Sequence, residues 1–404
     1  MTPLLRKFLG IHWIFFATMC GLLAFGVLCV YSAVHFREGD LAFLADKWED
    51  QMQWILYGLP VFFAVTLVDY KWVKWGAAPL YLAGLVLMTL LLIRGEEVYG
   101  QKIALNLGVR FQPSQVAIMS TIMLVSLVLA EGPKFLPLLR YHFLRLITAC
   151  LVFIVPFIYI LKAKDLGSAL VMLPVFAMLL LGGGIPYRYL LAMFLAGACL
   201  APIFYFFGLK DYQKERIDTT YMVLRGQKVN EKDEAYALVN NLIAIGSSGW
   251  EGKGYDPAKM AETTKSMTQL GLVSKKTAHD DFIFTVVAET FGFRGSALLI
   301  MGFLFMLLMC LTIALFSRDS LGRLLVVGIM GLIFAHCFEH IGMNIGLLPI
   351  TGIPLPLVSY GGTFIMICMF LLGLAQSVWV HRNIALQEPE AESAPGQRSA
   401  PPKR

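Results

Sequence analysis

A succession of long apolar runs constrains the fold of this chain more than any other feature. A helix needs about 17–25 apolar residues to cross a bilayer. Hydropathy finds such runs at about 11–34, 53–69, 75–93, 113–130, 143–162, 167–185, 189–208, 282–316 (one long or kinked span), 324–346 and 357–380. The chain is 58% hydrophobic and 15% charged, whereas about a quarter of a soluble domain is charged. We therefore expect an all-α polytopic membrane protein with about ten transmembrane helices.

The distribution of charge predicts how the helices are oriented. An even number of spans places both chain ends on one side, and the short loops of that side carry more lysine and arginine. Under the positive-inside rule, both termini are cytoplasmic. The net charge of +6 reflects these loops and does not indicate a nucleic-acid partner. We expect a membrane domain at 1–386 with a large extracytoplasmic loop at about 209–281, and a disordered tail at 387–404.

The large loop contains a glycine-rich stretch, Ile245–Gly254, which includes Lys253. Backbone N–H groups and a lysine in such a stretch can bind a phosphate group. The spacing fits neither the P-loop nor the dinucleotide-binding motif. A plain flexible loop explains the pattern equally well, so both interpretations stay open.

The loop ends at His279, Asp280 and Asp281, directly before the apolar run at 282–316. An aspartate in this position is most often a helix N-cap, whose carboxylate accepts backbone N–H bonds and complements the helix dipole. The position, where lipid headgroups meet water, also suits a carboxylate that acts as an acid or base on the polar head of a lipid. The residues alone leave both roles open.

Prolines and glycines interrupt the chain between the last two apolar runs. Pro349, Pro354 and Pro356 cannot continue a regular helix, and irregular backbone at membrane depth is tolerated where it lines a cavity. We expect this segment to turn back irregularly, with Ser359 and Tyr360 as polar scaffold residues of that wall.

Four blocks of the sequence carry a resemblance to a known family. They are Arg110–Ser114 (RFQPS), Asp165–Leu170 (DLGSAL), His279–Gly292 and Gly346–Gly362 (GLLPITGIPLPLVSYGG). Together with the loop stretch that ends in Gly252-Lys253-Gly254, they resemble the RodA/FtsW/SpoVE family, also called SEDS proteins, over residues 11–382. The first and last blocks are more similar to the elongation branch, RodA, than to the division branch, FtsW.

The resemblance implies a peptidoglycan glycosyltransferase of the bacterial cytoplasmic membrane. Such a protein polymerises lipid II, a disaccharide-pentapeptide on undecaprenyl pyrophosphate, on the outer face of the membrane. The elongation branch serves cell elongation and shape together with a class B penicillin-binding protein, which is a transpeptidase. Asp281 matches the family's catalytic aspartate, which implies a base that takes the proton from the acceptor sugar hydroxyl. Asp280 is then left as the helix cap.

The leaving group of this reaction is a lipid pyrophosphate, so cations or a divalent metal such as Mg²⁺ or Mn²⁺ must neutralise its charge. No set of protein ligands for a metal is evident in the sequence. The substrate-binding candidates are Lys102, Arg110, Gln112, Ser114, Asp165, Arg216, Lys253, His279, Glu289, Ser359 and Tyr360. Each of them has an ordinary alternative as an interfacial charge or a scaffold residue.

The chain departs from the family pattern at several positions. The family's glutamate and lysine after Gln-Pro-Ser are Gln115 and Ile118 here. Its Arg-Trp pair is Ile103-Ala104, and its asparagine before Ile-Gly-Met is His340. When both partners of a charge pair are replaced by neutral residues, no unpaired charge is left behind. The replacement at Gln115 and Ile118 should therefore disturb the protein less than the loss of one partner alone. We therefore expect a divergent member, in which these positions either abolish or retune the activity.

His336, Glu339 and His340 form an H-x-x-E-H pattern within an apolar run. Its two imidazoles share one helix face, as in an inverted zinc-protease motif, but no third ligand is evident. We interpret the cluster as a polar wall or a helix-packing site. Two other functions stay open for the chain: a lipid II flippase, which ten spans would also suit, and a non-catalytic scaffold for a transpeptidase.

Overall fold

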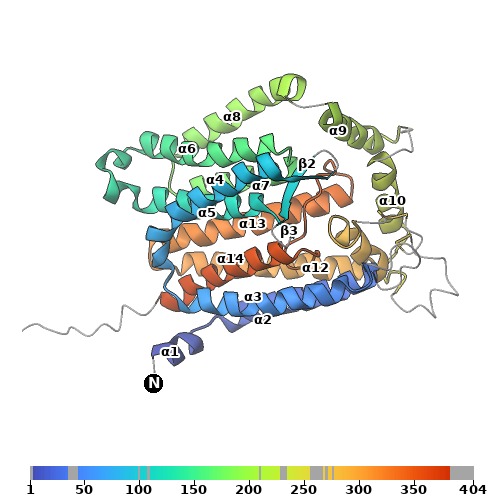
Figure 1. Cartoon of the computed structure of the whole chain (residues 1–404), viewed down its shortest axis with the longest axis horizontal. Coiled ribbons are helices and arrows are strands. Elements are labelled where there is room, and N and C mark those ends of the chain that lie inside the picture. Colours follow the sequence, from blue (N-terminus) through green and yellow to red (C-terminus); the bar gives the residue numbers. More distant parts are fainter. Residues whose placement is uncertain are drawn as a thin grey trace, which may run out of the picture.

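The computed structural model describes residues 3–34, 44–98, 101–106, 110–208, 211–227, 234–254, 267–268, 272–274 and 277–382. Long helices run side by side along one direction and make up most of the described chain (Figure 1). In chain order these are α2 (Trp13–Val34), α3 (Lys47–Leu67), α4 (Val73–Arg94), α5 (Pro113–Phe135), α6 (His142–Lys162), α7 (Leu166–Gly182), α8 (Tyr187–Ile203), α12 (Ile283–Leu315), α13 (Ser320–Asn344) and α14 (Gly362–His381). Each predicted apolar run falls on one of them.

The lengths and compositions of these helices suit a membrane. Within the described residues, seven helices (α2, α4, α5, α6, α12, α13 and α14) are long and apolar enough to cross a bilayer. α3 has 21 residues but carries two acidic residues in its first turn. α7 and α8 have 17 residues each, at the lower end of the length that a span needs. The prediction of an all-α polytopic membrane protein is confirmed.

Shorter elements connect the long helices. They are α1 (Pro3–Leu9), η2 (Tyr70–Trp72), η3 (Pro137–Arg140), the π-helical turn η4 (Phe204–Gly208), α9 (Asp211–Leu224) and α10 (Glu234–Gly246). Between α4 and α5, the strands β1 (Glu96–Val98), β2 (Gln101–Asn106) and β3 (Arg110–Phe111) form an antiparallel sheet in the order β1-β2-β3. Hydropathy did not predict this sheet. It places Arg110 opposite Asn106, directly before α5 begins.

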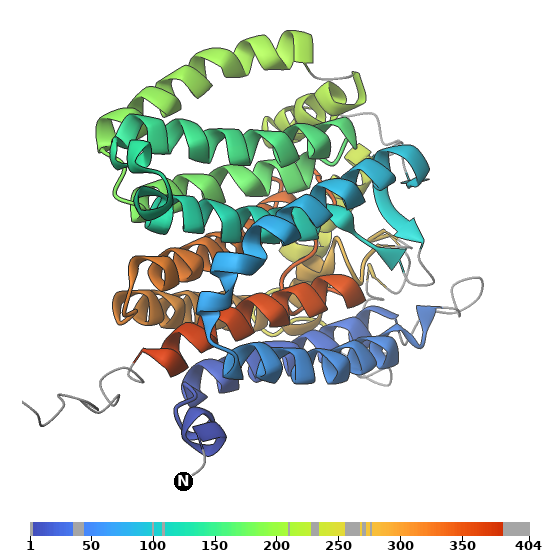
Figure 2. The same cartoon turned by 60° about the vertical axis from the view of Figure 1, so that its left-hand side comes forward.

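The centre of the bundle is formed by α5, α13 and α14. In the apolar stretch of α5, and likewise in that of α14, 78% of the residues are buried inside the protein. The corresponding share is 28% in α4 and 28% in α6. Lipid chains are as apolar as leucine, so membrane helices associate through close packing that small residues permit. A Cβ on Gly373 of α14 would lie 2.7 Å from the carbonyl oxygen of Phe62 of α3. α8 is the outermost helix (Figures 1 and 2), exposed on all sides along residues 191–200.

The two ends of the bundle differ. At one end the start of the chain meets the end of α14, where the rings of His12 and Trp379 lie 4.5 Å apart. The three-stranded sheet, α9 and α10 lie at the opposite end (Figure 1). The first and last described helices therefore share one end, as an even number of spans requires. The predicted disordered tail at 387–404 lies outside the described residues.

Candidate active site at the start of α12

Asp280 and Asp281 lie in a tight turn directly before α12. The backbone N–H groups of Asp280, Asp281 and Phe282 all donate to the carbonyl oxygen of Thr277, at 3.3, 3.0 and 3.2 Å. Phe282 is the N-cap of α12 and makes no side-chain cap bond. Asp280 is therefore not the helix cap that we expected. Because the turn begins at Thr277, the Asp280 carboxylate instead accepts the adjacent N–H of Asp281 at 2.7 Å.

The two carboxyls are only partly exposed, and their environment changes their acidity. Burial raises the pKa of Asp281 to about 7, although the Arg216 guanidinium acts in the opposite direction. Burial also raises the pKa of Asp280, the nearby Asp281 carboxylate raises it further, and Arg110 partly offsets this rise. A carboxyl with a pKa near neutrality suits general acid–base chemistry. Arg110 and Arg216, which are far apart in sequence, thus act electrostatically on the same carboxyl pair.

The irregular segment between α13 and α14 holds the backbone of this turn. Ser359 Oγ donates to the carbonyl oxygen of Asp280 at 2.6 Å and accepts the N–H of Leu355 at 2.8 Å. The N–H of Tyr360 donates to the carbonyl oxygen of His279 at 2.9 Å. These contacts agree with the predicted scaffold role of Ser359 and Tyr360, because they fix the backbone of the turn and do not involve its two carboxyl groups.

Asn344 and Gly352 complete the frame around Asp281. Asn344 Nδ2 donates to the carbonyl oxygen of Asp281 at 3.2 Å, and its Oδ1 accepts from Thr285 Oγ1 at 2.7 Å. Gly352 has a φ of +70°, and a Cβ there would lie 3.5 Å from Asp281 Oδ2. The glycine allows the left-handed turn that brings the backbone against the catalytic candidate.

A second polar cluster surrounds the Tyr360 hydroxyl, and the sequence analysis missed two of its members. Lys47 Nζ donates to Asp50 Oδ2 at 2.9 Å, and both lie 3.3 Å from the Tyr360 hydroxyl. The His279 ring lies 5.3 Å from the Tyr360 ring. The only available signal was an opposite-charge pair at i and i+3 before the second apolar run, which resembles any interfacial pair.

Lys253 and Glu289, both predicted to bind substrate, are paired with each other. Lys253 Nζ lies 3.0 Å from Glu289 Oε1, and the Glu289 side chain is almost fully buried. Glu289 also accepts from the N–H of Met267 and from the N–H and hydroxyl of Thr268, the latter two at 3.0 and 2.6 Å. This carboxylate therefore ties two parts of the large loop, at Lys253 and at Met267–Thr268, to α12. A substrate role for either residue stays a prediction.

The glycine-rich stretch joins α12 at a break in that helix. Gly292 has a φ of +64° and a ψ of −160°, so the helix hydrogen-bond ladder is interrupted there. The N–H groups of Lys253 and Gly254 donate to the carbonyl oxygens of Glu289 and Thr290 at 2.8 and 2.9 Å. The N–H groups of Phe293 and Arg294 donate to the carbonyl oxygens of Gly249 and Trp250 at 2.9 and 3.2 Å. The stretch thus satisfies backbone groups that the break exposes, and two of its N–H groups are used on α12.

Asp165 and Ser114 meet where α5 and α7 begin. Asp165 is the N-cap of α7, and its Oδ1 accepts the N–H of Ser168 at 3.0 Å. Burial raises the pKa of Asp165. The hydroxyl of Ser168 lies 3.5 Å from that of Ser114, at the start of α5. Gln112 is the N-cap of α5 without a side-chain cap bond.

Lys102 occupies a structural position. Its Nζ donates to the carbonyl oxygen of Leu92 in the last turn of α4 at 2.6 Å, and its N–H donates to the carbonyl oxygen of Ala163 at 3.0 Å. A cation at a helix C-terminus complements the helix dipole. The described contacts of its side chain lead to α4 and not to the turn at Asp281, so its substrate role stays a prediction.

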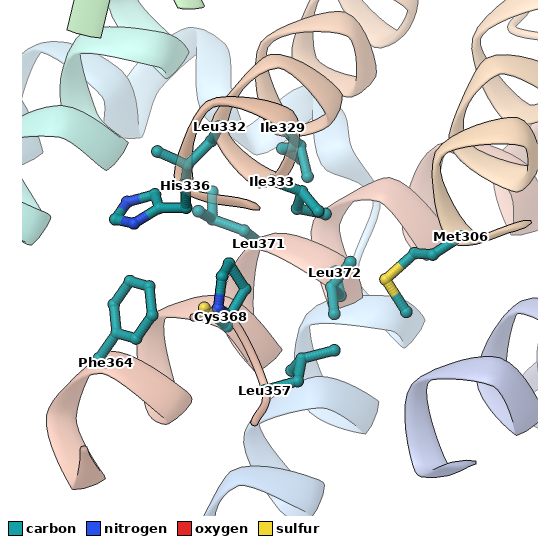
Figure 3. A pocket seen from close by; sticks show the side chains of 11 residues that line it. Met306, Ile329, Leu332, Ile333, His336, Leu357, Phe364, Cys368, Leu371 and Leu372 are labelled. Carbon is teal, nitrogen blue, oxygen red and sulfur yellow. The ribbon is translucent and has the colours of Figure 1, made fainter. Parts of the chain in front are cut away.

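The H-x-x-E-H residues are buried on α13. His340 Nδ1 lies 2.7 Å from the carbonyl oxygen of Ile353. His336 faces a mostly apolar pocket between α12, α13 and α14 (Figure 3), with its ring 5.0 Å from that of Phe364. Within the described ranges, no three histidine, cysteine or acidic residues are grouped so as to hold a metal ion. The geometry favours the helix-packing interpretation for the two histidines.

Comparisons with known proteins agree with this architecture. The sequence model of the FtsW/RodA/SpoVE family of cell cycle proteins matches residues 12–384 of this chain. Peptidoglycan glycosyltransferase MrdB of Escherichia coli (strain K12) is 28% identical over 369 residues, which are 91% of this chain and 92% of that protein. A probable peptidoglycan glycosyltransferase FtsW of Geobacter sp. (strain M18) is 30% identical over 368 residues, which are 88% of this chain and 93% of that protein.

A solved structure is also similar. That structure is of a peptidoglycan synthase complex and describes how the complex coordinates polymerization and crosslinking. One of its chains matches with a TM-score of 0.71 and 25% identity, over 92% of this chain and 98% of that chain. The arrangement of the helices is therefore shared along nearly the whole length of both chains.

Proposed function

Since the chain belongs to the FtsW/RodA/SpoVE family of cell cycle proteins, we propose that it is a peptidoglycan glycosyltransferase which extends glycan strands from lipid II. The names of its relatives from E. coli and Geobacter support this activity. The observation that carries the proposal is the position of Asp281: a partly exposed carboxyl at the end of the bundle, held by its backbone, with a pKa raised to about 7.

In the proposed reaction, Asp281 acts as the general base. The hydroxyl oxygen of the acceptor sugar forms a bond to the anomeric carbon of the donor, and the bond from that carbon to the lipid pyrophosphate breaks. Asp281 takes the hydroxyl proton, and the electron pair of the broken bond leaves with the pyrophosphate. A base is most effective when its pKa lies near the working pH, which is the condition that burial creates for Asp281.

Arg110 and Arg216 are the residues that we assign to the leaving group. Each acts electrostatically on the aspartate pair, so each lies within range of charge that develops beside Asp281. Guanidinium groups bind phosphate oxygens with two parallel hydrogen bonds. Positive charge held next to a departing pyrophosphate stabilises the transition state more than the ground state.

The cellular setting follows from the same proposal. The chain is a multi-pass membrane protein, and we place it in the bacterial cytoplasmic membrane with both termini inside, so that Asp281 faces the outer side. The partner is a class B penicillin-binding protein, an assignment that the similarity to a peptidoglycan synthase complex supports. The role in elongation rests on the RodA-like RFQPS and PLPLVSYGG blocks.

Reconstitution of the purified chain with its partner in vesicles tests the activity. Fluorescent lipid II is added to the outer or the inner leaflet, and both polymer formation and movement between leaflets are measured. The proposal predicts polymer from lipid II in the leaflet that Asp281 faces. Movement without polymer supports the flippase alternative, and neither polymer nor movement supports the scaffold.

A further inference from the structure

Two buried carboxyl groups, those of Asp165 and Glu339, lie inside the bundle within electrostatic range of each other. Asp165 is 6% exposed at the start of α7, and Glu339 is 5% exposed on α13. The charge of Asp165 acts on the Glu339 carboxyl, and the two surroundings meet: a Cβ on Gly167, two residues after Asp165, would lie 3.1 Å from Cβ of Thr351, which lies beside Glu339. Asp165 Oδ2 and Glu339 Oε1 have no hydrogen-bond partner among the described residues.

Hydroxyl groups line the surroundings of this pair. Ser114 and Ser168 lie beside the Asp165 carboxyl, and Thr351 lies beside that of Glu339. Ile118, one helical turn after Ser114, is apolar and buried. No ion pair between described residues includes either carboxyl. Among the residues that the structure describes, this place offers oxygen atoms but no positively charged partner for either carboxyl.

The energetics of burial require a ligand or a proton at this place. An unpaired buried carboxylate is strongly destabilising, and an unsatisfied buried polar atom in a native structure calls for an ion or water. Two carboxylates and three hydroxyls form an all-oxygen donor set, which hard cations prefer. Two negative charges match one divalent cation.

We propose that Asp165 and Glu339 bind a divalent cation of the Mg²⁺ type, with the hydroxyls of Ser114, Ser168 and Thr351 as neutral ligands. The site lies toward the end of the bundle that carries the sheet, because Ala163, two residues before Asp165, is bonded to β2. Such a cation would link α7 to α13, because Asp165 is the N-cap of α7 and Glu339 lies on α13.

This site is distinct from the proposed catalytic turn but shares a segment with it. Thr351 precedes Gly352, whose backbone packs against the Asp281 carboxyl. Gly167 of α7 also contacts this segment: a Cβ there would lie 3.1 Å from Cβ of Thr351. A bound cation would therefore hold in place the chain that frames Asp281. Cation binding itself does not require that Asp281 catalyse any reaction, so the two proposals fail independently.

Mn²⁺ binding to the detergent-purified, full-length protein tests the proposal. The electron paramagnetic resonance signal of free Mn²⁺ reports binding, and Mg²⁺ is used as a competitor. We expect one equivalent of bound Mn²⁺, displaced by Mg²⁺, and a thermal midpoint that rises with Mg²⁺ concentration. Glu339→Gln keeps the shape but removes the charge, and should weaken Mn²⁺ binding by more than about tenfold.

Glu251→Gln is the matched control, since Glu251 is an exposed carboxylate on the large loop, and it should bind Mn²⁺ like the wild type. A wild-type protein that binds no Mn²⁺ overturns the proposal in favour of a protonated carboxyl pair. Unchanged Mn²⁺ binding by Glu339→Gln overturns it as well. If that variant does not fold, Thr351→Val takes its place: weaker Mn²⁺ binding supports the site, and unchanged affinity overturns it.

Discussion

Gly252 of the large loop and Gly292 of α12 pack backbone against backbone. A Cβ on Gly252 would lie 2.4 Å from the amide nitrogen of Gly292, and a Cβ on Gly292 would lie 2.3 Å from that of Gly252. The loop thus lies in the break of α12, where it replaces the missing helical hydrogen bonds. The glycine-rich stretch has a structural explanation in this contact.

Gly252→Ala should therefore destabilise the protein strongly. The alanine would need a φ of +75° and would clash with backbone that cannot move away. Strain and overpacking together should lower the free energy of unfolding by about 2–5 kcal/mol. Gly249→Ala is the control, because Gly249 has a φ of +60° with no atom in the way, and should cost only about 1–2 kcal/mol. Equal thermal midpoints for the two variants would contradict the close packing.

The pairing of Lys253 with Glu289 leads to a double-mutant prediction. Glu289→Gln leaves a mostly buried ammonium without its partner, which should cost about 3–5 kcal/mol. Adding Lys253→Met removes the stranded charge and should restore part of the thermal midpoint. If the double variant is less stable than Glu289→Gln alone, the two side chains do not act as a buried pair.

Arg216 should set the pH at which the proposed base works. Asp281 must be deprotonated, so the polymerisation rate should rise with pH through a pKa of about 7. Arg216 lowers that pKa. Arg216→Met should therefore shift the rising limb of the profile to higher pH, in addition to any loss of rate.

Arg294→Met serves as the control for that profile. Arg294 is exposed and pairs with Glu251 on the large loop, so its removal should leave the midpoint of the pH profile in place. If the rising limb of the pH–rate profile keeps its position in Arg216→Met, the Arg216 guanidinium has no influence on the group that titrates.

Hydropathy located each long helix of the described part of the chain, because the hydrocarbon core of a bilayer demands a continuous apolar run for each span. The prolines at 349, 354 and 356 likewise predicted the irregular segment before α14, which the structure confirms. The strands β1–β3 were missed, since they are short and lie in a polar loop without alternation. These outcomes follow from local composition alone.

The contacts of the site depend on residues that are distant in sequence. Lys253 and Glu289 are 36 positions apart, and each in isolation resembles a charge that faces substrate. Lys47 and Tyr360 are 313 positions apart. No local pattern encodes these pairings. The family resemblance pointed to Asp281, which lies at the end of the bundle and whose catalytic role stays a prediction. It also implied that Asp280 caps α12, but the Asp280 carboxylate bonds the adjacent amide instead.

The most direct measurement is the rate of glycan synthesis from lipid II by the purified complex of this chain with its partner, for the wild type and for Asp281→Asn. Asparagine keeps the size of the side chain and removes the base, so we predict a loss of about 10²–10⁴-fold, with an unchanged thermal midpoint as the sign of intact folding. A folded Asp281→Asn protein that polymerises lipid II at the wild-type rate would contradict the assignment of Asp281 as the catalytic base.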